Sequence, residues 1–214
     1  MLFVARLADP GKDQGDIWTN MESLAKDFQD RGITLLYVSK RQESPDTSII
    51  ASAKSEDEFR IALREILGIK TDERDLTIFP LVRMKLFEVP ENIGKEASRY
   101  LITVKTTSSA AERIYQLLSD LRPSSDISFT YLAFISNPPG DTLTLSSFAK
   151  SNEHLQRFIQ QELSEIHGIV SLNVTPISKT KRLIPYSEMI EVLRRDLGDL
   201  GIVRPLLDLS DLSQ

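Results

Sequence analysis

The sequence contains no cysteine, only two histidines and no long run of apolar residues. The lack of cysteine excludes disulfide bonds and thiol chemistry, and it is typical of proteins kept in a reducing compartment. A membrane-spanning helix needs about 20 consecutive apolar residues, and this chain has no such run. Residues 1–6 also lack the charged and apolar regions of a signal peptide. We therefore expect a cytoplasmic protein without a membrane partner.

An excess of positive charge is also missing, because 26 Lys and Arg residues stand against 31 Asp and Glu residues, for a net charge of −5. Proteins that bind nucleic acids normally present a basic surface that neutralises phosphates. We therefore expect no direct binding to nucleic acid. One local basic cluster, Lys179, Lys181 and Arg182, follows an expected strand, and we interpret it as a solvated strand end.

The chain does contain an internal repeat. Ala53-Lys54-Ser55 returns as Ala149-Lys150-Ser151, and four further matches occur in the same order. These pair Phe3–Leu7 with Tyr100–Val104, Ile33–Tyr37 with Ile127–Tyr131, Asp46-Thr47 with Asp141-Thr142, and Leu76–Leu81 with Leu172–Ile177. Ordered matches over the whole length indicate a duplicated domain. We expect one domain at 1–91, a second at 92–186, and a C-terminal helix with a leucine-rich tail at 187–214.

Within each repeat the spacing of apolar residues changes between that of strands and that of helices. In the second repeat we expect strands at 99–105, 127–135, 142–148 and 169–178, and helices at 111–121 and 151–166. Pro123 should end the first of these helices, and Ser151 should cap the second. The turn between the middle strands is marked by Asn-Pro-Pro-Gly-Asp at 137–141.

The first repeat shows the same order of elements. Its first helix carries Trp18, Met21, Leu24, Ala25 and Phe28 on one face, which we interpret as a core stripe and not as a cofactor contact. Its second helix begins with Ser-Glu-Asp-Glu at 55–58. This pattern is typical of a capping box, in which the serine and the last glutamate bond each other's backbone amides.

The order strand, helix, strand, strand, helix, strand is that of a ferredoxin-like domain, an α+β fold with both helices on one face of an antiparallel sheet. Adjacent apolar residues such as Leu35 and Leu36 place apolar side chains on both faces of the sheet. The second face must therefore be buried as well. We expect the two tandem domains to pack face to face or to join into an intramolecular pseudo-dimer resembling a dimeric α/β barrel.

The stretch Gly-Asp-Thr-Leu-Thr-Leu-Ser-Ser-Phe-Ala-Lys-Ser-Asn-Glu-His-Leu at 140–155, continued by Glu-Ile-His-Gly-Ile-Val at 165–170, resembles the ligand-binding (RAM) domain of the leucine-responsive regulator/AsnC family. Members of that family usually carry a helix-turn-helix before this domain, whereas this sequence opens on a strand. The resemblance therefore implies a stand-alone regulator without its own DNA-binding domain, which senses a small molecule or modulates assembly. The implied partners are an amino acid or other small metabolite, and further copies of the chain or related regulators.

Family ligands lie near the Gly/Asp hairpin, which implies a ligand site at Gly140, Asp141 and Thr142 and a weaker one at Asp46 and Thr47, where the glycine is absent. An ionised aspartate can accept hydrogen bonds from an ammonium group, and a glycine lets backbone amides approach a carboxylate. The same residues are also those of an ordinary tight hairpin. A purely structural role for this turn therefore remains open.

Two other functions remain open. One is a small monooxygenase- or isomerase-like enzyme of the dimeric α/β barrel class, and the other is a structural interaction module. His154 and His167 have no second metal ligand at a useful spacing, so we expect no metal, no cofactor and no catalytic residue. A polar cavity around either histidine would favour the enzyme.

Beyond the repeats, residues 187–197 have the spacing of an amphipathic helix, with Met189, Ile190, Leu193 and Leu197 on one face. Gly198 should end this helix. The segment Pro205–Leu212 that follows is rich in leucine. Because an exposed apolar strip promotes aggregation, we expect the C-terminal segment to pack on the domain and not to be offered to a partner.

Overall fold

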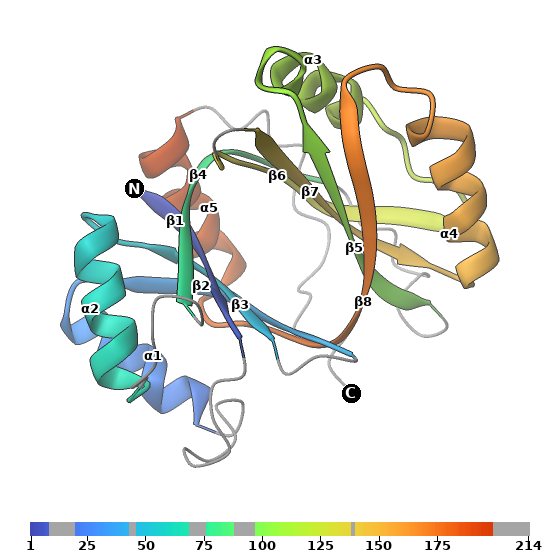
Figure 1. The fold of residues 1–214 in the computed structure, drawn as a ribbon. Helices are drawn as coiled ribbons and strands as arrows, with labels where there is room; N and C mark the ends of the chain where they lie inside the picture. The colour runs from blue at the N-terminus through green and yellow to red at the C-terminus, as the bar shows by residue number, and fades with distance from the viewer. Residues whose placement is uncertain (9–19, 43–45, 69–75, 88–96, 138–139, 199–214) are drawn as a thin grey trace. The chain divides into compact units, whose positions relative to one another are not determined.

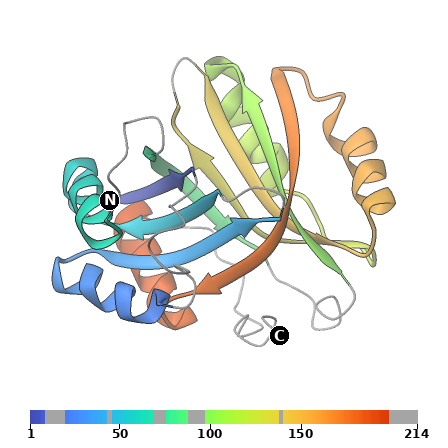
Figure 2. The same ribbon diagram turned by 60° about the horizontal axis from the view of Figure 1, so that its bottom comes forward.

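The computed structural model of the chain describes residues 1–8, 20–42, 46–68, 76–87, 97–137 and 140–198. They form two compact units (Figures 1 and 2). Unit 1 contains the described residues of Met1–Leu81 and Ser178–Gly198, and unit 2 contains those of Val82–Ile177.

Both repeats contain the predicted elements in the predicted order. The first repeat comprises β1 (Leu2–Leu7), α1 (Met21–Asp30), β2 (Thr34–Arg41), β3 (Thr47–Ser52), α2 (Glu56–Ile66) and β4 (Leu76–Leu86). The second comprises β5 (Ser98–Thr106), α3 (Ser108–Ser119), β6 (Ile127–Ile135), β7 (Asp141–Ala149), α4 (Asn152–Phe158), the π-helical segment η1 (Ile159–Leu163) and β8 (Ile169–Arg182). The predicted C-terminal helix follows as α5 (Tyr186–Leu197).

All the strand pairs are antiparallel where their register is described. In the first repeat β1 lies between β3 and β4, and β2 pairs with the other side of β3. In the second repeat β7 lies between β5 and β6, and β8 pairs with the other side of β5. The strand order is β1-β3-β2-β8-β5-β7-β6-β4, which is that of a closed barrel. The predicted fold class, two tandem ferredoxin-like repeats with the topology of a dimeric α/β barrel, is confirmed.

The compact units do not follow the repeat boundaries expected after residues 91 and 186. They divide inside β4, after Leu81, and inside β8, after Ile177. Both strands are long, and the chain continues to form backbone hydrogen bonds after Leu81 and after Ile177. In unit 2, the Phe87 amide donates to the Thr130 carbonyl, and in unit 1 the Leu183 amide donates to the Leu36 carbonyl. The C-terminal helix is likewise part of unit 1.

Each unit has an apolar core between the two helices of its repeat and one face of its sheet. Figure 1 shows α1 and α2 on one face of β1, β2 and β3. Leu35 belongs to the core of unit 1, whereas its neighbour Leu36 is buried outside that core. In unit 2, Ile102 likewise belongs to the core, and its neighbour Leu101 is buried outside that core. The expectation that both faces of the sheets are buried is confirmed at these positions.

The second helix of each repeat starts at a serine cap. The Ser55 Oγ accepts a hydrogen bond from the Glu58 amide at 3.2 Å, and the Ser151 Oγ accepts one from the His154 amide at 3.3 Å. These bonds satisfy amides that the helix itself cannot pair. The predicted caps are confirmed, and they show that His154 occupies the position of Glu58 in the first repeat.

Ser55→Ala and Ser151→Ala should each lower the free energy of unfolding by about 1 kcal/mol, the usual cost of losing a serine cap. Urea unfolding would measure this loss. Ser55→Asp and Ser151→Asp are the controls, since aspartate also caps well, and both should keep most of the stability. Equal losses in the alanine and aspartate variants would show that the caps do not hold these helices.

Helix α5 packs against unit 1 on the side of the sheet opposite to α1 and α2. Ala51 and Ala53 of the first repeat face the helix-side core, so the side chain of Ser52 between them points to the other side. There the Ser52 Oγ donates to the Asp196 carboxylate at 2.6 Å, and α5 also contacts β1. This helix therefore packs on the domain. The leucine-rich stretch Pro205–Leu212 lies outside the described residues.

Asp196 ties α5 to this sheet. Its side chain is only 6% exposed. Burial by itself would raise the pKa of Asp196, but hydrogen bonds from Arg195, Ser52 and the terminal ammonium outweigh burial and hold the pKa below its ordinary value. The folded protein therefore favours the carboxylate, and this contribution is lost as the pH falls.

Asp196→Asn should lower the free energy of unfolding at neutral pH by about 1–2 kcal/mol, because a hydrogen bond to a charged group is lost. A carboxyl group whose pKa is lower in the folded state than in the unfolded state stabilises the folded protein at pH values above the unfolded-state pKa of about 3.9. This stabilisation is lost as the pH falls through the folded-state pKa. The difference between the two proteins should therefore shrink below about pH 4. Urea unfolding from pH 7 to pH 2 measures it, and a difference that stays constant with pH would contradict this role.

Candidate functional site

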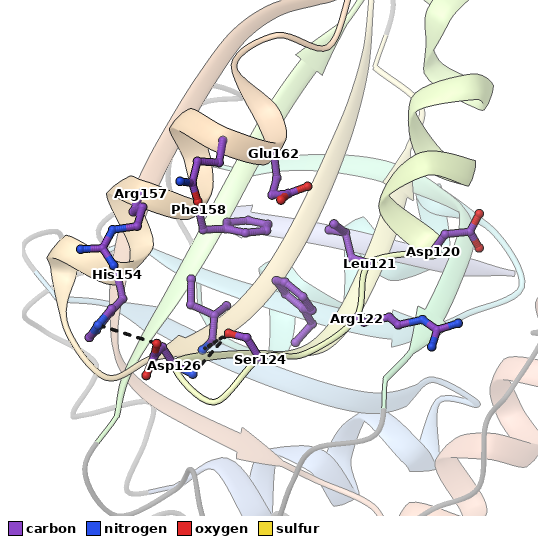
Figure 3. Close-up of a pocket in the computed structure, with 12 residues that line it drawn as sticks. Asp120, Leu121, Arg122, Ser124, Asp126, His154, Arg157, Phe158 and Glu162 are labelled. Atoms are coloured by element: carbon purple, nitrogen blue, oxygen red, sulfur yellow. Dashed lines mark hydrogen bonds and ion pairs between the residues drawn. The ribbon is translucent and has the colours of Figure 1, made fainter.

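A cavity of about 460 Å³ lies in unit 2, between the chain segment that follows α3 and the helix formed by α4 and η1. Figure 3 shows the residues that line it. The segment 120–126 forms one side, the start of β6 forms the floor, and residues 154–162 form the other side. We call it the α3–α4 cavity.

One wall of the cavity exists because α3 ends earlier than its sequence pattern predicts. Leu121 was expected on the helix, but α3 ends at Ser119. Pro123 has no amide to donate to the Ser119 carbonyl, and its ring would clash with that carbonyl in a continued helix. The Lys85 ammonium donates to this carbonyl instead. The freed residues 120–126 make a longer connection than residues 31–33 of the first repeat.

The opposite wall contains a π-helical segment. The sequence pattern predicts one continuous helix at 151–166, but α-helical bonding ends at Phe158 and η1 continues to Leu163. The Ser164 amide and its Oγ both donate to the Ile159 carbonyl at 2.9 Å. Single π turns of this kind occur frequently at functional sites. In the first repeat, α2 is an ordinary α-helix from Glu56 to Ile66.

Most residues that line the cavity are polar, but part of its floor and wall is apolar. The ring of Phe158 lies with its centroid 5.4 Å from that of Phe129, which is almost completely buried. Phe87 extends this aromatic group, with a centroid distance of 5.5 Å to Phe129. Leu121 and Ile127 complete the apolar lining. A ligand with an apolar part can therefore bury it here.

The charged residues of the cavity differ in direction. Figure 3 shows the Glu162 carboxylate directed toward the space between Phe158 and Leu121, whereas Arg157 and Arg122 are directed away from it. Glu162 is exposed and makes no ion pair with any described residue. The Glu162 carboxylate is thus the charged group directed toward the apolar part of the cavity.

His154 lies at the rim of the cavity. Its Nδ1 lies 2.9 Å from the Ser151 Oγ, and its Nε2 lies 3.8 Å from the Asp126 carboxylate. Lys150 also contacts Asp126, at 3.3 Å. The hydrogen bond from Lys150 lowers the pKa of Asp126, and the charge of His154 adds to this effect. Both ring nitrogens of His154 thus face partners within the protein, and the Asp126 charge is balanced locally.

The predicted ligand residues of the second repeat lie at the other end of β6 and β7. Thr142 pairs with Ile135 there, whereas Ile127 at the cavity pairs with Ala149. A side chain at position 140 would place its Cβ 2.7 Å from the Thr106 carbonyl oxygen, which explains why a glycine is present. Asp141 is half-buried and Thr142 is buried. Ligand binding at these three residues stays a prediction.

In the first repeat, Asp46 forms an ion pair with Arg41 at 3.3 Å, and Thr47 is buried. Asp46, Arg41 and Arg6 border a cavity of about 60 Å³, which is the volume of about two water molecules. A ligand role for Asp46 and Thr47 also stays a prediction.

Sequence reasoning missed the α3–α4 cavity. Two signals pointed to it: the longer connection that contains Pro123, and the histidine that replaces a capping glutamate at His154. In the described part of the chain, no three His, Asp or Glu side chains are grouped so as to hold a metal ion. No described helix is long and apolar enough to cross a membrane.

No protein-family model and no curated protein matches this sequence. Among solved structures, a putative monooxygenase from Lactobacillus acidophilus NCFM aligns with a TM-score of 0.50 and 10% identity, over 85% of this chain and 96% of that one. An anthrone oxidase-like protein aligns with a TM-score of 0.46 and 10% identity, over 85% and 93%. The similarity establishes the fold alone. The finer resemblance to the leucine-responsive regulator/AsnC family therefore remains a proposal.

Proposed function

We propose that this protein is a small-molecule-sensing regulator that binds its ligand in the α3–α4 cavity. The observation that carries the proposal is the cavity itself, a pocket of about 460 Å³ with a mostly polar lining, an apolar part at Phe158 and Leu121, and a carboxylate directed toward that part. Ligand sites in proteins typically measure about 300–1,000 Å³ and combine an apolar lining with a few polar groups.

The groups that border the inner space favour binding over chemistry. Phe158, Leu121 and Glu162 can hold and orient a ligand, whereas nucleophilic catalysis would require a nucleophile beside a free general base. The hydroxyl nearest to His154 belongs to Ser151, which already serves as a helix cap. The cavity therefore has the groups of a recognition site.

A ligand in this cavity would contact the segment that follows α3 and the helix formed by α4 and η1. It would join the segment after α3 to η1, two parts of the chain that differ from their counterparts in the first repeat, where the connection is shorter and the helix has no π turn. Binding to the folded state stabilises it by mass action, and a state with these segments held together would be favoured. This gives the protein one sensing site per chain and a local change that related regulators could recognise.

Thermal-shift screening with amino acids and other small metabolites tests this function, because a ligand that binds only the folded state raises Tm. Gln161→Trp should block the cavity and weaken the binding of any hit by about tenfold or more. Gln160→Trp is the matched control, since Gln160 is the exposed neighbour of Gln161 and does not line the cavity. Hits that bind both variants equally well would place the site elsewhere, and a screen without hits would count against sensing.

His154 at the cavity supports a second candidate, a small monooxygenase- or isomerase-like enzyme of the dimeric α/β barrel class. In that case His154, held by Asp126, would act as a general base toward a ligand in the cavity. The measurement is conversion of bound aromatic ligands, including oxygen uptake. Conversion that is lost in His154→Gln but kept in His167→Gln would favour the enzyme, and equal rates in both variants would exclude His154 as the base.

A further inference from the structure

We propose that the ligand of the α3–α4 cavity is an organic cation, an amine or quaternary ammonium compound with an apolar body, and that Glu162 is its counter-ion. This proposal rests on the proposed function, because it requires that the cavity binds a small molecule. It assigns the cavity a chemical class of ligand.

The first argument is the position of the Glu162 carboxylate. It is directed into the space between Phe158 and Leu121 (Figure 3), and no described residue forms an ion pair with it. Of the two other acidic residues that line the cavity, Asp126 is already balanced by Lys150 and His154, and Figure 3 shows the Asp120 carboxylate directed away from the inner space. Glu162 is thus the anionic group left to attract a ligand toward the inner space.

The second argument is the surface beside this carboxylate. Phe158 and Phe129 form an aromatic group at the cavity wall, with a centroid distance of 5.4 Å. Aromatic faces attract cations, and quaternary ammonium ligands are typically bound by aromatic side chains. The same rings also bury the apolar body of a ligand. One wall therefore serves both parts of an amphipathic cation.

The third argument is the direction of the basic residues. An anionic ligand would need a cation beside the inner space, but Figure 3 shows Arg157 and Arg122 directed away from it. Both side chains are exposed and belong to the outer rim. The charged group that Figure 3 shows directed toward the inner space is the Glu162 carboxylate, and like charge disfavours carboxylates and phosphates there.

Three probes with similar apolar bodies test the inference: phenethylamine as the cation, 2-phenylethanol as the neutral compound and 3-phenylpropionate as the anion. NMR titration of the intact protein would give the three affinities. We expect phenethylamine to bind about fivefold more tightly than 2-phenylethanol. The difference is modest because Glu162 is exposed to solvent, where an ion pair and a cation–aromatic contact each add little affinity. The anion should bind most weakly, and added salt should reduce the preference for the amine.

Glu162→Gln should remove the preference for phenethylamine and leave the binding of 2-phenylethanol nearly unchanged. Glu165→Gln is the matched control, because Glu165 is exposed close by and does not line the cavity. Equal binding of all three probes in the native protein would overturn the cation assignment while supporting a small-molecule site. No binding of any probe would contradict the proposed function as well.

Discussion

Phe59→Ala is expected to lower the free energy of unfolding by about 3–5 kcal/mol, the usual cost of removing a buried phenylalanine. Phe59 is fully buried, and its ring centroid lies 6.3 Å from that of Phe3 and 6.5 Å from that of Phe28. It therefore joins α2 to β1 and α1. The truncation leaves a cavity among three elements that a small local movement cannot fill. Urea unfolding followed by circular dichroism measures the loss.

Two further variants sharpen this test. Ile61→Ala changes an exposed residue of the same helix and should cost less than about 0.5 kcal/mol. Leu155 follows Ser151 by the same spacing as Phe59 follows Ser55, and it is also fully buried. Leu155→Ala should cost about 2–5 kcal/mol. A cost below about 1 kcal/mol for both Phe59→Ala and Leu155→Ala would contradict the assignment of equivalent cores.

Gly168→Ala should destabilise the protein by about 2–4 kcal/mol, for two reasons that add. Gly168 has a φ of 98°, which residues with a side chain rarely adopt. A Cβ there would also lie 2.4 Å from the Cβ of Ala110, so α3 or the start of β8 would have to move. The Gly168 carbonyl accepts a hydrogen bond from the Thr107 amide at 3.1 Å, and that movement would weaken it.

Gly32→Ala separates the two effects. Gly32 also has a positive φ, of 74°, but no atom lies within 4 Å of the added Cβ. Only the backbone conformation is penalised there, at about 1–2 kcal/mol. Thermal unfolding of both variants measures the difference. Equal losses would show that Gly168 is not held against α3.

The regular elements could be predicted because their signals are local. The strand expected at 127–135 matches β6 residue for residue, and β7 exceeds its predicted range by one residue at each end. Alternating apolar residues and a turn containing Gly140 are sufficient there. The serine caps at Ser55 and Ser151 were also predictable, because a cap needs only the residues of its own helix start.

The site could not be predicted in the same way. The cavity depends on where α3 stops and on the π turn at 159–163. The Ser119 carbonyl at the end of α3 is bonded by Lys85, which is distant in sequence, and no sequence pattern used above predicts a π turn. The hairpin at Gly140 stood out in the sequence, but the glycine has a structural cause in the approach of Thr106. The presence of a glycine at position 140 therefore does not require a ligand.

In the proposed function, one repeat of this duplicated fold carries a small-molecule site that the other lacks. An NMR titration of the labelled protein with phenethylamine tests it most directly, because each amide reports its own surroundings. We predict saturable shifts at Leu121, Phe158 and Glu162, and none at the equivalent helix of the first repeat around Ala62 and Ile66. Shifts of equal size in both repeats, or no saturable shift around the α3–α4 cavity, would contradict the account.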